Sequence, residues 1–319
     1  MTTRIGEQQG GTALIVGCGY LGTRLAQHLI SQGTTVFGTT RSELKAKRLA
    51  PLGIRPLLLS VTQPLTYASL SPALSADPLD VYYMIPPGRL DGSPSTRQIV
   101  LGGTAHMVKA LKHSQLRRAI LVSSTAVYGQ TDGQVVDADA PALPTSERAA
   151  LMQRGEQLWL DAGESFHVLR LAGLYGPSRI IGLKAVREQA PLIGDPQALL
   201  NLIHVDDAVS LLLAISQSKT ANSIELGCDG RPTPRIEYYA YLAGRLGVAP
   251  PVPMDASMAA IQFGLNPQRL ARSSSKALDN RPTSERNGWE PAYPDYRVGL
   301  DALLNPDTPV ESEPTGRTC

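Results

Sequence analysis

A glycine-rich turn that directly follows a short apolar segment constrains the fold of this chain more than any other feature. The segment Thr12–Val16 is almost wholly apolar and leads into Gly17-Cys18-Gly19-Tyr20-Leu21-Gly22, after which a helical pattern runs to Ser31. A strand, a G-x-G-x-x-G turn and a helix in this order are typical of the first unit of a dinucleotide-binding sheet. The turn therefore predicts a dinucleotide site, with a glycine-rich turn that binds no ligand as the alternative.

The three glycines of this turn have separate expected roles. Gly17 permits the tight turn, Gly19 lets backbone amides approach a pyrophosphate, and Gly22 lets the helix pack against the strand. Tyr20 and Leu21 open the helix, whose N-terminal amides and positive dipole end favour phosphate groups. We therefore expect these five residues to lie at the cofactor.

Further short apolar segments alternate with helical patterns as far as residue 230. They are near-continuous apolar runs, which are typical of strands buried on both faces. The helical patterns include Tyr20–Ser31 and Thr96–His113. This alternation predicts the α/β class, with a doubly wound parallel sheet. The predicted strands are Thr12–Val16, Thr34–Phe37, Ile54–Leu59, Val81–Ile85, Ala119–Val122 and Val168–Leu171.

The composition of the sequence changes after residue 178, where proline and glycine become frequent and apolar segments alternate less clearly with helical patterns. One more strand–helix pair follows, Asn201–Val205 and Asp206–Ser216, and it predicts a return to the main sheet. The predicted division is a first domain over 11–178 that 201–227 rejoins, a smaller region over 179–200 and 228–304, and flexible tails over 1–10 and 305–319.

Composition excludes several classes of protein. Hydrophobic residues make up 42% of the 319 residues and charged residues 18%, with a net charge of +2, which argues against a disordered chain and against long-range capture of nucleic acid. No apolar run is long enough to span a membrane, and the N-terminal residues lack the apolar core of a secretory signal. The cysteines and histidines show no disulfide framework or metal-ligand spacing. We therefore expect a cytoplasmic protein without a metal, nucleic-acid or membrane partner.

The end of the second predicted strand indicates which dinucleotide binds. An NAD site usually carries Asp or Glu there for the ribose hydroxyls. This chain has Thr39-Thr40-Arg41-Ser42, with no acid before Glu43. Arg41 offers a fork of donors suited to a 2′-phosphate, so the sequence favours NADP over NAD. The alternative is that Arg41 is a solvated arginine that opens the next helix.

Four further segments carry a resemblance to a known family. They are Leu121–Gly129 (LVSSTAVYG), Arg170–Pro177 (RLAGLYGP), Ile203–Ala208 (IHVDDA) and Gly288–Pro291 (GWEP). Together with the glycine turn, they resemble the extended short-chain dehydrogenase/reductase superfamily, and most closely its NAD-dependent epimerase/dehydratase branch. The resemblance implies a Rossmann-type domain, a small C-terminal substrate domain and a nicotinamide cofactor lying across the strand ends.

The chain departs from this family at its acid–base pair. The family couples hydride transfer to proton transfer through Tyr-x-x-x-Lys, in which the lysine lowers the pKa of the tyrosine. The matching positions hold Arg148 and Met152, and no tyrosine or lysine occurs from Gln130 to Phe166. Gly173 also replaces an asparagine that contacts the diphosphate region in sugar-nucleotide members. The resemblance therefore implies an atypical member with a relocated proton donor.

The resemblance also implies which residues form the site. Ser124 falls on the position whose hydroxyl bonds the reacting oxygen, with Thr125 beside it, although both hydroxyls could instead satisfy local backbone groups. Tyr128 and Tyr175 could supply a replacement phenol, and core packing is the alternative for each. The expected cofactor-binding residues are Gly17, Gly19, Tyr20, Leu21, Gly22, Thr40, Arg41, Pro86, Pro87 and Ser123.

Three functions remain open on these grounds. The first is an NADP(H)-dependent oxidoreductase or epimerase that acts on a small polar, sugar-nucleotide-like substrate. The second is a sensor or regulatory protein that binds NADP(H) without turnover, and the third is a scaffold in which the dinucleotide is structural. A homodimer through residues 96–113 and 146–160 is a further prediction from the resemblance, although internal packing explains the apolar residues of these segments equally well.

Overall fold

The structure, a computed structural model, describes residues 11–88, 94–264 and 275–305. The predicted tails lie outside these described residues, apart from Asn305. The chain forms two compact units, each built from several segments. The first unit comprises Met1–Val127, Pro144–Arg170 and Leu212–Glu225, and the second comprises Tyr128–Leu143, Leu171–Leu211 and Leu226–Cys319.

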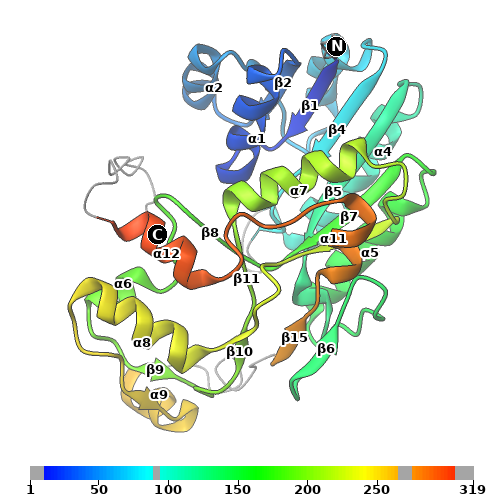
Figure 1. The fold of residues 1–319 in the computed structure, drawn as a ribbon. Coiled ribbons are helices and arrows are strands. Elements are labelled where there is room, and N and C mark those ends of the chain that lie inside the picture. The colour runs from blue at the N-terminus through cyan, green and yellow to red at the C-terminus, as the bar shows by residue number, and fades with distance from the viewer. Residues whose placement is uncertain (1–10, 89–93, 265–274, 306–319) are drawn as a thin grey trace, which may run out of the picture. The chain divides into compact units, whose positions relative to one another are not determined.

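A central sheet of seven strands dominates the fold (Figure 1). Its strands are β1 (Thr12–Val16), β2 (Thr35–Thr40), β3 (Arg55–Leu58), β4 (Leu79–Tyr83), β5 (Leu116–Ser124), β7 (Phe166–Leu171) and β12 (Ile224–Gly227). The strands lie in the order β12-β7-β5-β4-β1-β2-β3, and β3, β2, β1, β4 and β5 pair in parallel. This doubly wound order confirms the predicted α/β class. The order reverses between β1 and β4, and ligands of such sheets bind at the carboxyl ends of the strands beside this switch point.

Helices of the first unit connect these strands. They are α1 (Tyr20–Ser31), α2 (Glu43–Leu49), α3 (Ser71–Leu74), α4 (Gly103–Leu111) and α5 (Glu147–Leu160). Ser42 and Ser146 cap α2 and α5, because their hydroxyl oxygens accept from the amides of Lys45 and Ala149. The prediction for α1 is confirmed over its full length.

The predicted helix over Thr96–His113 is confirmed from Thr96 to Leu111, but it is not a regular α-helix throughout. It contains a π-helical turn over Gln98–Gly102, after which Gly103–Leu111 forms α4. This turn packs closely on α5, since a Cβ added at Gly155 would lie 2.7 Å from the Cγ1 atom of Val100. A π-helical turn widens the helix locally, and the hydrophobic periodicity of the sequence does not reveal it.

The core of the first unit lies on both faces of the sheet. Tyr82 and Tyr83 are adjacent on β4 and point to opposite faces, and both are buried. The ring of Tyr83 packs on Trp159 of α5 at 5.4 Å, and Trp159 packs edge-on against Phe166 at 5.1 Å. The indole Nε1 of Trp159 donates to the carbonyl oxygen of Ala119. Tyr82 and Tyr83 therefore both pack in the core of the first unit.

The second unit is a set of small two-stranded sheets and helices. The strand pairs are β6 (Gln134–Val136) with β15 (Lys276–Leu278), β8 (Gly173–Tyr175) with β11 (Leu202–His204), β9 (Leu192–Ile193) with β14 (Pro253–Met254), and β10 (Leu199–Leu200) with β13 (Thr233–Pro234). The helices are α6 (Leu183–Arg187), α8 (Arg235–Leu246), α9 (Ala256–Phe263), α11 (Arg281–Asn287) and α12 (Tyr296–Leu304), while α7 (Val205–Gln217) is divided between the two units.

Aromatic residues form much of the second unit's own core. Tyr175, Tyr238 and Tyr296 are each fully buried, together with Leu242 and Leu300. The second tryptophan, Trp289, is also buried, and its indole Nε1 donates to the Ser210 hydroxyl oxygen at 2.8 Å.

The prediction that residues 201–227 return to the main sheet is wrong in part. The predicted strand at 201–205 forms β11, which pairs with β8 in a separate sheet, and only β12 joins the seven strands. Gly173 makes this pairing close, because a Cβ there would lie 3.0 Å from the carbonyl oxygen of Asn201. In the compact units, only Leu212–Glu225 of this stretch belongs to the first.

Candidate functional site

The glycine turn has the geometry that a pyrophosphate site requires. Gly17 has a φ of +99°, and its amide donates to the Thr39 hydroxyl oxygen at 2.9 Å. A Cβ at Gly22 would lie 2.6 Å from the carbonyl oxygen of Gly17, so α1 packs directly on the turn. A Cβ at Gly19 would meet no atom closer than 3.9 Å. The turn therefore leaves space beside Gly19, where the amides could approach a ligand.

The N-terminus of α1 presents its amides without a side-chain cap. Gly19 is the N-cap residue, and no side chain accepts from the first-turn amides in the part of the chain that the structure describes. Uncapped amides and the helix dipole together favour an anionic group. The residues of this turn thus fit the pyrophosphate of a dinucleotide.

Cys18 packs inside the turn and is not exposed to reagents. Its thiol is 1% exposed and lies against Gly38 of β2, where an added Cβ would be 2.5 Å from its Sγ atom. Burial raises the pKa of this thiol to about 12, so it stays protonated at neutral pH. Cys18 therefore acts as a small packing residue.

Two cations lie at the carboxyl end of β2. Arg41 is exposed, between Thr40 at the end of the strand and the capping Ser42 of α2. One turn into α2, the ammonium of Lys45 partly opposes the rise in the pKa of Cys18, which places its charge within reach of the glycine turn. Lys45 was not predicted as a site residue, although its place in the first turns of α2, four residues after Arg41, could have suggested it.

The segment after β4 is held at both ends. The amide of Met84 donates to the carbonyl oxygen of Val16 at 2.8 Å, at the switch point of the sheet. Pro86 and Pro87 follow, and the carbonyl oxygen of Gly88 accepts from the Nη1 atom of Arg148 at 2.8 Å. The two prolines expected at the cofactor therefore lie on a segment clamped by α5.

The two serines that end β5 differ in their partners. The Oγ atom of Ser124 accepts from the amide of Ala126 at 3.2 Å, which leaves its own hydrogen available for donation. The hydroxyl of Ser123 instead donates to the Oε1 atom of Glu156 on α5. Thr125 is buried at the start of the next turn. The geometry thus suits Ser124 as a donor to a ligand oxygen.

Glu156 and Arg170 form a buried ion pair beside these serines. The Nη2 and Nε atoms of Arg170 lie 2.7 and 3.1 Å from the Oε2 atom of Glu156. The side chains are only 2% and 5% exposed. This pair was not predicted from the sequence, because the two partners come from different elements. The spacing Arg148, Met152, Glu156 along one helix face was the available signal.

The two positions at which the resemblance predicts the acid–base pair hold side chains that cannot transfer a proton. Met152 is 8% exposed within α5, and its thioether carries no proton to transfer. Arg148 is a permanent cation whose guanidinium binds the Gly88 carbonyl. Neither side chain reproduces a phenol with a lowered pKa.

Both tyrosines proposed as replacement phenols are buried in the second unit. Tyr175 is fully buried, its hydroxyl packs against Gly299 of α12, and burial raises its pKa further. Tyr128 is 1% exposed, and its carbonyl oxygen accepts from the Nζ atom of Lys276. Burial of this kind favours the packing alternative for each residue.

His204 and Asp207 organise a turn in the second unit. The ring of His204 stacks on Tyr293 at 3.8 Å, and the amide of Asp206 donates to its Nδ1 atom. The carboxylate of Asp207 accepts from the amides of Ala292 and Tyr293 at 2.8 and 3.0 Å. These contacts hold the junction between β11 and α7 in place, which is a structural role for His204.

No group of three or more His, Cys, Asp or Glu side chains is arranged to bind a metal ion in the described ranges. Across those same residues, none of the helices is both long enough and apolar enough to cross a membrane.

Comparisons with known proteins give a family and several relatives. A model of the NAD dependent epimerase/dehydratase family matches residues 13–227. Protein YeeZ of Escherichia coli strain K12 is 30% identical over 290 residues, which cover 89% of this chain and 97% of YeeZ. A 3-diazoavenalumate denitrifying reductase of Streptomyces sp. is 29% identical over 218 residues, which cover 64% of this chain and 71% of the reductase.

A solved structure has the same fold over nearly its whole length. It is described as a functionally unknown conserved protein from Silicibacter pomeroyi DSS, with a TM-score of 0.74 and 29% identity. The likeness covers 92% of this chain and 98% of that chain. These matches agree with the resemblance that the sequence motifs indicated.

Proposed function

Because the chain belongs to the NAD dependent epimerase/dehydratase family, we propose that it is an NADP(H)-dependent oxidoreductase or epimerase that acts on a small polar substrate. The observation that carries this proposal is the glycine turn at the switch point of the sheet, with open space at Gly19 and uncapped amides on α1. A reductase among the relatives supports reduction as the kind of reaction.

The preference for NADP(H) rests on the charges at the end of β2. Arg41 is exposed and Lys45 lies one turn further along, whereas an NAD site would carry an acid at the end of the strand. A guanidinium can bind a 2′-phosphate through two parallel hydrogen bonds. The two cations therefore support the phosphorylated cofactor.

The chain's own residues would share the remaining work. A bound nicotinamide would supply or accept the hydride. Ser124 would donate a hydrogen bond to the reacting oxygen, and Arg148 would hold the segment after β4 in place through Gly88. The proton donor is relocated, because Arg148 and Met152 cannot transfer a proton. Cytoplasmic location and a homodimer through α4 and α5 remain predictions.

A second candidate is a protein that binds NADP(H) without turnover. The loss of the acid–base pair at Arg148 and Met152 favours it. One experiment separates the two candidates: NADPH and NADH are titrated by fluorescence, and a panel of carbonyl and sugar-nucleotide substrates is then followed by NADPH absorbance. Turnover of any substrate supports the enzyme, whereas tight NADPH binding with no turnover supports the sensor. Absence of dinucleotide binding contradicts both.

A further inference from the structure

Lys276 is a buried lysine whose ammonium has a single acceptor. It lies on β15 in the second unit and is 5% exposed, while the chain's other six lysines are exposed. Its Nζ atom donates to the carbonyl oxygen of Tyr128 at 2.9 Å, and the described residues offer it no other hydrogen-bond partner. An ammonium carries three donors, so two have no acceptor among the described residues.

The backbone of Lys276 is fixed on both sides of its strand. On one side β15 pairs in parallel with β6, with Lys276 opposite Gln134. On the other side the Asn201 side chain bridges the strand, since its Nδ2 atom donates to the Lys276 carbonyl and its Oδ1 atom accepts from the Leu278 amide. The lysine is therefore held in place before any ligand arrives.

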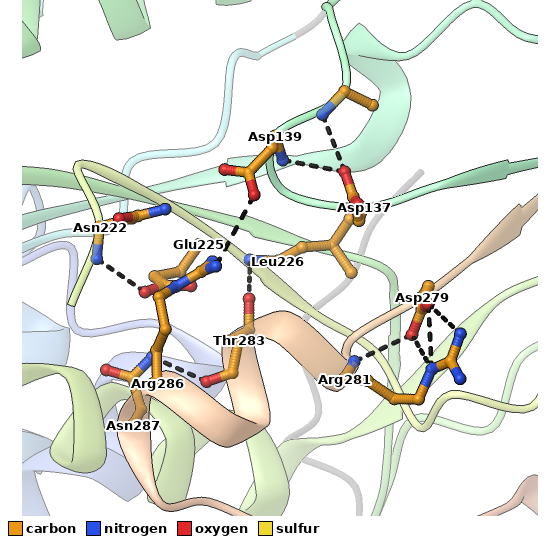
Figure 2. Close-up of polar contacts among 11 residues, drawn as sticks. Asp137, Asp139, Asn222, Glu225, Leu226, Asp279, Arg281, Thr283, Arg286 and Asn287 are labelled. Carbon is orange, nitrogen blue, oxygen red and sulfur yellow. Dashed lines mark hydrogen bonds and ion pairs between the residues drawn. The ribbon is translucent and has the colours of Figure 1, made fainter. Parts of the chain in front are cut away.

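The carboxylates that follow these two strands are engaged with other groups (Figure 2), and Asp132, which precedes β6, accepts from the amide and the hydroxyl of Thr131 at 3.2 and 3.0 Å. Asp279 accepts from the backbone and guanidinium of Arg281, at 2.6 to 3.1 Å. Asp137 accepts from the amides of Asp139 and Ala140, and Asp139 itself lies 3.7 Å from the guanidinium of Arg286. None of these carboxylates pairs with Lys276.

The sequence that precedes Lys276 supplies no counter-charge either. From Ala256 to Leu278 the chain contains no aspartate or glutamate, whereas Arg269 and Arg272 precede Lys276. Consistent with this, burial lowers the pKa of Lys276 to about 8, and no carboxylate opposes the shift. A buried cation without a partner is costly, and an apolar residue would fill the same space without that cost.

We propose that Lys276 anchors an oxyanion, a carboxylate or a phosphate, of the molecule that the second unit binds. The anion accepts hydrogen bonds from the two remaining N–H groups of the ammonium and supplies its counter-charge. That this molecule is the substrate rests on the proposed function. The substrate class is then an anionic one.

The test observes the lysine itself. Lysine-selective ¹³Cε labelling gives seven signals, one for each lysine of the chain. Lys276 is assigned from the signal lost in Lys276→Arg. Should that variant fail to fold, exchange of the six exposed lysines for arginine assigns Lys276 by elimination. The wild-type protein is then titrated with sodium acetate and with inorganic phosphate, against sodium chloride at equal ionic strength.

The expected result is that acetate or phosphate shifts the Lys276 signal and raises its apparent pKa by about one unit or more. The exposed Lys184 should stay unchanged and serves as the internal control. A response to acetate alone indicates a carboxylate ligand, and a response to phosphate alone indicates a phosphorylated one. If neither anion moves the Lys276 signal, the lysine only holds the Tyr128 carbonyl and the proposal is wrong.

A separate NADPH titration keeps this result distinct from the proposed function. If Lys276 responds to an anion but NADPH does not bind, the proposed function fails and the anion site stands. If NADPH binds but Lys276 does not respond, the anion site fails and the proposed function stands.

Discussion

The guanidinium of Arg148 donates to the carbonyl oxygen of Gly88 at 2.8 Å, so α5 is tied to the segment that follows β4. The resemblance to the epimerase/dehydratase family predicts a tyrosine base at this position, where the chain has an arginine. Here that position serves to fix backbone beside the switch point of the sheet. Arg148 thus positions backbone where the resemblance predicts an acid–base group, and the first prediction rests on this difference.

Introducing the family's Tyr-x-x-x-Lys pair at positions 148 and 152 should not increase activity. Arg148→Tyr with Met152→Lys removes the clamp on Gly88 and places a lysine where the structure is 8% exposed, so any native activity should stay the same or fall. Steady-state kinetics on an active substrate measures this. A loss of about a hundredfold or more in Met152→Ala, with folding intact by circular dichroism, would indicate a lost general acid–base group and contradict the prediction.

Arg41 should determine the preference for NADPH over NADH. Arg41→Ala should erase most of a several-fold preference, because a charge-assisted contact contributes about 1.5–3 kcal/mol. Arg48→Ala is the matched control, since it removes an exposed arginine from α2, the helix that begins two residues after Arg41. Isothermal titration with both dinucleotides gives the ratio. Equal affinities in the wild-type protein would rule out the NADP assignment.

Ser124 should support the chemical step. Ser124→Ala removes a donor whose oxygen is already positioned by the amide of Ala126, and such a loss typically lowers kcat by about 10²–10³. Binding of NADPH should be unaffected, which serves as the control for folding. A variant as fast as the wild-type protein on every active substrate would remove Ser124 from the mechanism.

Glu156 should contribute strongly to stability. Glu156→Gln leaves the buried Arg170 without its counter-charge, and breaking a buried pair in this way typically costs about 3–5 kcal/mol. Glu188→Gln disrupts the exposed Lys184–Glu188 pair and should change the free energy of unfolding by less than about 1 kcal/mol. Urea unfolding of both variants gives the comparison, and equal losses would contradict it.

Asp229 should make stability depend on pH. Its Oδ1 atom accepts from the Arg231 amide, while its buried Oδ2 atom has no partner within the described ranges. Burial, with smaller contributions from Asp295 and Asp207, raises the pKa of Asp229 to about 8. The unfolded value is about 3.9, so the folded state binds this proton more tightly. The free energy of unfolding should therefore fall as pH rises from about 4 to 8.

Asp229→Asn isolates this contribution. The variant should lose that part of the pH dependence and become more stable relative to the wild-type protein as pH approaches 8. Urea unfolding at pH 5 and at pH 8 gives the free energy of unfolding of both proteins, and the difference between them should be larger at pH 8. Parallel pH profiles for the two proteins would count against a raised pKa.

The sequence predicted the parts of the structure that depend on local patterns. The glycine turn, α1 and the parallel strands follow from residues that are neighbours in the chain, and the roles of Gly17 and Gly22 agree with their geometry. The helix predicted over 96–113 forms as far as Leu111, but its π-helical turn, which packs against α5, was not predicted.

The parts that escaped prediction depend on partners far apart in the chain. Glu156 meets Arg170 from another element, and Lys276 reaches Tyr128 across 148 positions. The pairing of β11 with β8 is of the same kind, since only the folded backbone brings the two strands together. Residue patterns indicate which chemical groups are present, but the fold decides which of them are paired.

The placement of the two tryptophans gives each compact unit its own optical probe. Trp159 is enclosed by Tyr83 and Phe166 in the first unit, and Trp289 is bonded to Ser210 in the second. Trp159→Phe and Trp289→Phe would each leave one emitter, so the melting of either unit can be recorded by fluorescence alone. Coincident transitions would mean that the whole chain unfolds as one cooperative system, and separated transitions would mean that each unit is stable by itself.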